Sequence, residues 1–147
     1  MLGRMERQPR DDILAWEVTL AHRPPDARGA VCHRFVEHGI TPDQVKAVLD
    51  DGGDALYAAA NSGDQNWTDC FGGPLAVALL AAEVSALAAH LNARGSAVRA
   101  LAVDALLDDF SAVTVAASLG VSRQKVYDLS RANRMSSHID RVPWRQP

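Results

Sequence analysis

The segment that most constrains this chain is VAASLGVSRQKVYDL, residues 115–129. Gly120 can adopt a positive φ without steric cost, which predicts that a first helix ends there. Ser122 suits the N-cap of a second helix, because its hydroxyl accepts a hydrogen bond from an N–H of the first turn. Ala116, four residues before the glycine, is small enough for two helices to approach each other closely. The segment therefore predicts two helices that cross at a tight turn.

The apolar residues of this segment are spaced to form one small core. Val121 is expected beneath the turn, and Val126 and Leu129 lie on one face of the second helix. We expect four further apolar residues to join this core: Phe110, Val113, Val115 and Leu119.

The other face of the second helix, expected over about residues 123 to 132, is polar and mostly basic. Arg can bind guanine, and Gln can bind adenine, through two hydrogen bonds in the major groove of DNA. Residues in the first turn of a recognition helix reach deepest into that groove. We therefore expect base contacts from Arg123, Gln124, Lys125 and Tyr127. Contacts to phosphates, which set register without reading sequence, are expected from Ser122, Arg131 and Arg134.

The segment from Ser111 to Arg131 resembles the helix-turn-helix superfamily of DNA-binding proteins. It is most similar to the three-helix modules of resolvase-type recombinases, sigma-factor C-terminal regions and bacterial repressors. The resemblance implies duplex DNA binding through the second motif helix, with Ser96 to Asp109 as the first of three helices. Asp128 departs from the pattern, because it would repel phosphate unless it accepts from a cytosine amine or pairs with Arg131.

The charge of the chain is divided unevenly. Residues 1–110 hold nine Lys or Arg and sixteen Asp or Glu, whereas residues 111–147 hold six and two. A basic DNA-reading end on an acidic body would produce this division. Aromatic residues make up 5% of the chain, and alanine is abundant. This composition favours closely packed helices over sheets, so the predicted fold is all-α.

We predict four segments along the chain. They are a flexible lead (1–10), an acidic helical domain (11–93), the helix-turn-helix module (96–135) and a basic tail (136–147). Within the acidic domain, helices are expected over 13–22, 27–38, from Pro42 onward, over 55–61 and over 75–94. Gly95 is expected to end the last of these, and Ser96 to cap the next.

A weaker copy of the motif lies upstream, at Gly39-Ile40-Thr41. Thr41, Pro42 and Gln44 form a strong helix start with a capping box. However, Phe35 occupies the place where a small residue is needed, and acidic residues follow. We interpret this segment as an ordinary helix corner that does not read DNA.

Other chemistry finds little support in the sequence. Cys32, His33, His38 and Cys70 match no zinc spacing, and no nucleophile or phosphate loop accompanies the acidic pairs. We expect no metal, no cofactor and no enzymatic activity. The run 75–91 carries Glu83 and His90, so a buried helix is expected rather than a membrane span. Trp67 and Phe71 are expected to fill a gap beside the long helix, with a small-molecule pocket as the alternative.

The expected function is sequence-specific binding of double-stranded DNA, as in a bacterial-type or phage-type transcriptional regulator. A single reading helix makes few contacts, so we expect a homodimer, with residues 75–94 as its interface. A cytoplasmic, nucleoid-associated location is expected. One alternative is a protein-interaction module of antitoxin or adaptor type, which binds a partner through the acidic domain. The other is a DNA-binding accessory protein of recombination or segregation.

Overall fold

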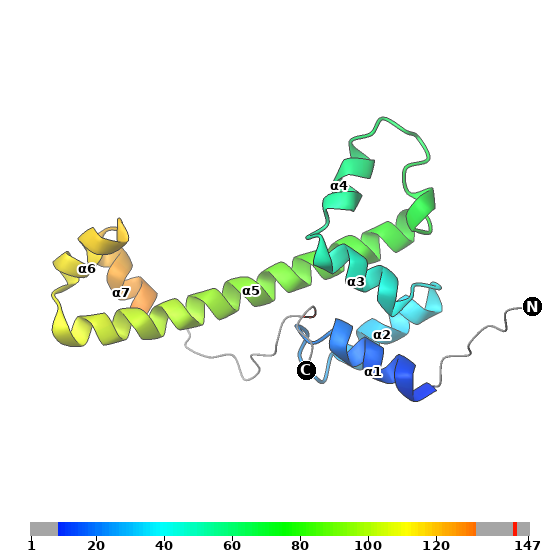
Figure 1. Cartoon of the computed structure of the whole chain (residues 1–147). Helices are drawn as coiled ribbons and strands as arrows, with labels where there is room; N and C mark the ends of the chain where they lie inside the picture. Colours follow the sequence, from blue (N-terminus) through cyan, green and yellow to red (C-terminus); the bar gives the residue numbers. More distant parts are fainter. Residues whose placement is uncertain (1–8, 132–142, 144–147) are drawn as a thin grey trace, which may run out of the picture. The chain divides into compact units, whose positions relative to one another are not determined.

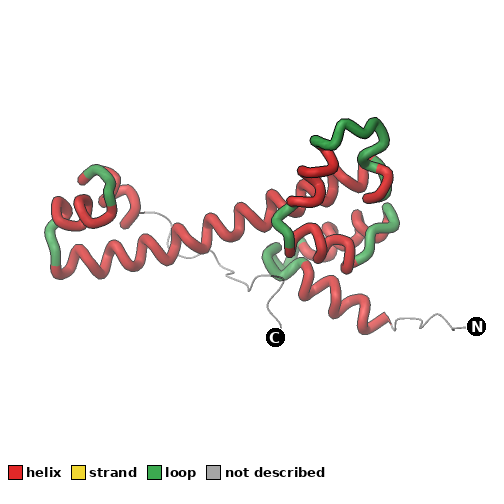
Figure 2. Tube along the Cα trace, turned by 45° about the horizontal axis from the view of Figure 1, so that its top comes forward, coloured by secondary structure: helices red, strands yellow, loops and turns green. Residues whose placement is uncertain are grey.

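The computed structural model describes residues 9–131 and residue 143, and all regular structure within them is helical, as Figure 2 shows. The prediction of an all-α fold is therefore confirmed. The expected basic tail apart from residue 143, together with Arg134 and residues 1–8 of the expected lead, lies outside the described residues. In chain order the α-helices are α1 (Pro9–Thr19), α2 (Arg28–Glu37), α3 (Pro42–Asp50), α4 (Asp54–Ala60), α5 (Pro74–Asp109), α6 (Ala112–Leu119) and α7 (Arg123–Arg131) (Figure 1).

The chain divides into two compact units within α5, between Ala88 and Ala89. The N-terminal unit holds α1 to α4 and the first half of α5. At its centre the rings of Trp16 and Phe35 stack with their centroids 5.6 Å apart. The buried residues of this core are Trp16, Leu20, Val31, Phe35, Ile40, Val45, Val48, Leu49, Leu56, Ala76, Leu80 and Leu87.

The first helix, α1, lies earlier than expected: it begins at Pro9, inside the expected lead, and ends at Thr19 rather than at residue 22. Three backbone carbonyls beyond its end, those of Leu20, Ala21 and Arg23, accept hydrogen bonds from the Arg28 guanidinium at 3.0–3.1 Å. This side chain from the next helix satisfies carbonyls that a longer α1 would otherwise bond. The sequence pattern around Pro24 did not reveal that contact.

The capping box predicted at the start of α3 is confirmed. The Gln44 backbone N–H donates to Thr41 Oγ1 at 3.2 Å, and the Thr41 N–H donates to Gln44 Oε1 at 2.8 Å. Pro42 occupies the first helical position, as expected. In the loop before α5, Phe71 packs partly against the core, but Trp67 does not belong to it. Trp67 is half-buried and lines a pocket with Leu56 of α4 and Val77 of α5, so it lies beside the long helix at the edge of that core.

One expectation about α5 is wrong: Gly95 does not end the helix, and Ser96 does not begin a new one. The helix runs unbroken from Pro74 to Asp109, and Gly95 has no positive φ. A glycine inside a helix costs only about 1 kcal/mol relative to alanine. Burial of Ala97, Ala100 and Val103 beyond it favours continuation of the helix.

Two side chains, those of Arg23 and His22, surround Glu83, the buried acid of α5. Arg23 Nη2 donates to Glu83 Oε2 at 2.9 Å, and His22 Nε2 lies 2.5 Å from Oε1. Burial by itself raises the pKa of the Glu83 carboxyl, but the hydrogen bonds from His22 and Arg23 outweigh burial and hold the pKa below its ordinary value of 4.5. Glu83 therefore stays ionised in the core of the N-terminal unit.

Along α5 the apolar residues do not all face the core. Leu80 and Leu87 are buried, whereas Leu75 and Leu91 are 54% and 38% exposed. The expectation of a buried helix over residues 75–91 is thus correct for one side only. Among the described helices, α5 is long and apolar enough to cross a membrane. This is weak evidence, because core helices of ordinary globular proteins satisfy the same criteria.

Candidate nucleic-acid interface

The turn between α6 and α7 has the geometry that its sequence predicts. Gly120 adopts φ 68° and ψ 35°, the left-handed conformation that glycine takes at least cost. The Val121 N–H donates to the Ala116 carbonyl at 3.1 Å, and the Gly120 N–H to the Ala117 carbonyl at 3.4 Å. These two bonds form a Schellman motif, which satisfies the last carbonyls of α6 and turns the chain.

Two residues after the glycine, Ser122 starts α7 as predicted. The Lys125 backbone N–H donates to Ser122 Oγ at 3.1 Å, which satisfies one of the free donors of the first turn. Because its oxygen accepts this bond, the Ser122 hydroxyl keeps its own hydrogen for a further acceptor such as a phosphate oxygen.

The core beneath this corner is small and apolar. Val126 is fully buried and Leu129 is 6% exposed, so the inward face of α7 is as expected. Ala116 lies between α6 and α7 at 7% exposure. The C-terminal part of α5 supplies the third helix, which takes the place of the separate helix expected from Ser96. The buried residues of this core are Val103, Ala112, Val115, Ala116, Val126 and Leu129, with Leu107, Val121 and Tyr127 partly buried against it.

Three residues predicted for this core are largely outside it. Phe110 and Val113 are 53% and 63% exposed, because Phe110 follows the last residue of α5 and Val113 lies on the outer side of α6. Leu119 is 41% exposed as the last residue of α6, at the edge of the core. The inward face of α6 is formed by Ala112, Val115 and Ala116 instead.

Three of the four residues predicted to contact bases have close neighbours within this unit. Gln124 Nε2 donates to Asp128 Oδ1 at 3.1 Å, so Asp128 pairs with Gln124 rather than with Arg131. The Arg123 guanidinium lies over the Tyr127 ring, with 6.0 Å between its central carbon and the ring centroid. Tyr127 itself is half-buried against the core, which restricts its reach.

Lys125 is exposed, and so is Arg131, one of the residues expected to contact phosphate. With Arg123 they give the outer surface of α7 three cations against the single carboxylate of Asp128. The surface of α7 is therefore basic, and two of its side chains, those of Gln124 and Arg123, are oriented by neighbours within the helix.

Two features of this corner were missed by the sequence analysis. Ser111 caps α6, because its Oγ accepts from the Thr114 backbone N–H at 3.2 Å. The Gln124–Asp128 hydrogen bond joins residues four apart on one helix face, which is ordinary i,i+4 spacing. Both signals were present in the sequence: a serine before an apolar helical run, and an amide four residues before a carboxylate.

The cysteines and histidines of the described part of the chain were considered as metal ligands. Among the described residues, no three His, Cys, Asp or Glu side chains lie close enough to hold a metal ion. Cys32 is half-buried on α2, and burial raises the pKa of its thiol. Cys70 is exposed, as is His33.

Comparison with known proteins adds no further guide. No family model matches the chain, and neither the curated proteins nor the solved structures include a significant match.

Proposed function

We propose that the unit formed by the C-terminal part of α5, α6 and α7 binds double-stranded DNA, with α7 in the major groove. The observation that carries this proposal is the α6–α7 corner itself. Its glycine turn, serine cap and buried Ala116 hold a short basic helix rigidly at the protein surface. A helix held in this way matches the width of the major groove.

Within this proposal the side chains of α7 divide between two tasks. Arg123 and Gln124 are held by Tyr127 and Asp128, so they would meet a base edge with little loss of side-chain freedom. Lys125 and Arg131 are exposed cations suited to phosphates. The Gln124–Asp128 pair would also orient the Gln124 amide, which favours one base over another.

A transcriptional regulator that binds DNA as a homodimer is the form of this function that we favour. One short helix buries little surface, and two copies related by a two-fold axis would double the contacts. On α5 of the N-terminal unit, Leu75 is exposed and available to a second copy, whereas Leu80 and Leu87 are buried within one chain.

The decisive experiment is selection of bound duplexes from a random DNA pool with the full-length protein, followed by binding at increasing salt. An enriched motif with two-fold symmetry supports a dimeric, sequence-specific reader. Salt-sensitive binding without enrichment would mean nonspecific DNA association. Absence of binding at about 50 mM salt would contradict the proposal, since phosphate contacts are strongest there.

A matched pair of variants locates the interface. Arg123→Ala combined with Lys125→Ala should abolish enrichment, whereas Arg99→Ala, an exposed arginine on α5 of the same unit, should leave it unchanged. An equal loss of enrichment in both variants would mean that the positive side chains of this unit attract DNA without a specific role for α7.

A further inference from the structure

A groove between α1 and α2 has no role in the function proposed above. It encloses about 460 Å³ within the N-terminal unit. Trp16, Leu20 and Cys32 form its floor, and Ile13 and Val36 stand at its two sides.

The floor of the groove is rigid, because it is part of the core. Trp16 is 7% exposed and stacks on Phe35, and Leu20 is fully buried. The sides are different: Ile13 is 64% exposed and Val36 is 57% exposed. Ile13 and Val36 thus expose apolar surface to water beside a rigid aromatic floor. Covering this surface with a partner would be favourable, because apolar surface would be removed from water.

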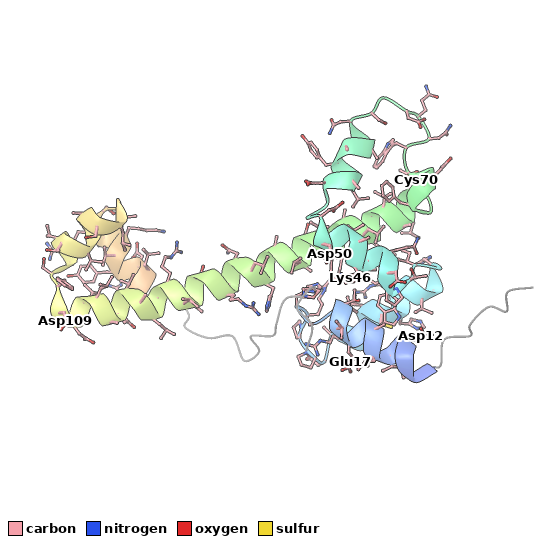
Figure 3. The ribbon with its side chains drawn as sticks, viewed as in Figure 1. Asp12, Glu17, Lys46, Asp50, Cys70 and Asp109 are labelled. Atoms are coloured by element: carbon pink, nitrogen blue, oxygen red, sulfur yellow. The ribbon has the colours of Figure 1, made fainter. Side chains whose placement is uncertain are left out.

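The charges around the groove are unbalanced. Asp12 and Glu17, which Figure 3 labels on α1, bring two carboxylates to its lining. Among the described residues of the lining there is one cation, Arg28, whose guanidinium donates to the backbone carbonyls of Leu20, Ala21 and Arg23. The edge of the groove is therefore acidic around an apolar centre.

We propose that this groove binds an amphipathic helix of a partner protein, whose apolar stripe is flanked by Lys or Arg. The apolar stripe lies between Ile13 and Val36, and the flanking cations meet Asp12 and Glu17. The open sides suit a helix that lies along the groove better than a small molecule, which a pocket normally encloses.

Two helical segments of a second copy, α7 and the last turns of α5, are poor occupants of the groove. The basic helix α7 has buried its own apolar residues: Val126 is fully buried and Leu129 is 6% exposed. In the last turns of α5, the exposed Leu106 lies close to Asp108 and Asp109, which the acidic groove would repel.

The test uses two labelled helical peptides of about 18 residues, long enough for five turns. Both carry the same leucine stripe, flanked by Lys in one peptide and by Glu in the other. Binding to the full-length protein is followed by fluorescence anisotropy. We expect the Lys peptide to bind at least about tenfold more tightly than the Glu peptide. Replacing both acids, Asp12→Asn with Glu17→Gln, should remove that preference.

Two neighbouring residues of α1 provide a matched control for the apolar contact. Ile13 and Leu14 are both 64% exposed, but only Ile13 lines the groove. Ile13→Ser should weaken binding of the Lys peptide at least about tenfold, and Leu14→Ser should leave it unchanged. Circular dichroism melts check that both variants fold.

Three results would overturn the proposal. The first is no saturation by either peptide up to about 1 mM. The second is an equal effect of Ile13→Ser and Leu14→Ser. The third is a dimer, seen by sedimentation equilibrium, that Ile13→Ser dissociates, since the groove would then belong to a second copy. DNA selection with Ile13→Ser should give the wild-type result, which separates this proposal from the DNA-binding one.

Discussion

Two corners of this molecule, α2–α3 and α6–α7, use the same backbone design. Gly39 and Gly120 adopt φ values of 70° and 68°, and each ends a helix. Thr41 and Ser122 then cap the next helix, with side-chain bonds of 3.2 and 3.1 Å to a backbone N–H three residues on. The turn and its cap therefore do not distinguish an ordinary corner from a candidate DNA-reading one.

The residue four positions before each glycine makes the first difference. In α6 it is Ala116, and α6 packs directly against α7. In α2 it is Phe35, which stacks on Trp16 of α1, and α3 packs chiefly against α1. A small residue allows two helices to approach each other, whereas a large one ties the corner to a third helix.

The outer surface of the second helix makes the other difference. α3 carries Asp43 and Asp50 against one cation, Lys46, which pairs with Asp50, as Figure 3 shows. α7 carries three cations against one acid. The same backbone device thus presents an acidic helix in one unit and a basic helix in the other, and only the basic one suits DNA.

The largest expected effect comes from removing the aromatic residue of the first corner. Phe35→Ala should lower the free energy of unfolding by about 3–5 kcal/mol, because it deletes a fully packed ring from the core. Urea denaturation followed by circular dichroism measures this. Val36→Ala, at an exposed neighbour, is the control and should cost less than about 0.5 kcal/mol. Equal losses from the two would mean that Phe35 does not anchor this corner.

A somewhat smaller loss is expected from Glu83→Gln, which leaves His22 and Arg23 without their buried anion. At neutral pH we expect a loss of about 3 kcal/mol in the free energy of unfolding. Because the folded-state pKa of Glu83 is depressed, its stabilisation is present above pH 4.5 and is lost as pH falls through the lower folded value. The difference between wild type and variant should therefore shrink between pH 7 and pH 3. A constant difference would contradict this account.

Ala116→Phe would place in the α6–α7 corner the residue type that Phe35 provides in the α2–α3 corner. We expect a loss of about 1–3 kcal/mol, since a ring between α6 and α7 must push the helices apart. Ala117→Phe, on the exposed side of α6, is the matched control and should be near neutral. Thermal unfolding of both variants tests the comparison. An unchanged melting temperature for Ala116→Phe would show that the corner does not need a small residue.

We proposed that α7 binds DNA and that α3 does not. The substitution that tests this difference should have an effect similar to or smaller than that of Ala116→Phe. Arg123→Ala should cost about 1–3 kcal/mol of binding free energy on a selected duplex and relax the preference at one base pair. Lys46→Ala, which removes the exposed cation of α3, should change nothing. Fluorescence anisotropy on the selected duplex and on its single-base variants measures both. Equal effects of Arg123→Ala and Lys46→Ala would contradict the proposal that α7 contacts DNA and α3 does not.

Local signals in the sequence predicted the corners well. The two glycines, Gly39 and Gly120, and the two caps, Thr41 and Ser122, act through bonds within about five residues, so the amino acids themselves specify the geometry. The difference between Phe35 and Ala116 was also readable, because a large and a small residue occupy equivalent places before the same turn.

Predictions from a local sequence pattern were wrong where tertiary packing favoured a different structure. Gly95 and Ser96 predicted a break in α5, but the cost of a helical glycine is small compared with the burial of Ala97, Ala100 and Val103 beyond it. Tyr127 was expected on the outer face of α7, yet its ring lies partly against the core. Helical periodicity assigns a direction to each side chain but does not say how far a neighbouring helix covers it.

By itself, then, the sequence determined the helical fold, the two corners and the opposite charges of their second helices, because each depends on residues close together in the chain. Only the tertiary structure decided that Glu83 meets His22 and Arg23, which precede it by about sixty residues. It alone also placed Ile13 and Val36 at the two sides of one acidic groove. Contacts of this kind depend on how helices pack, and no local spacing in the chain encodes them.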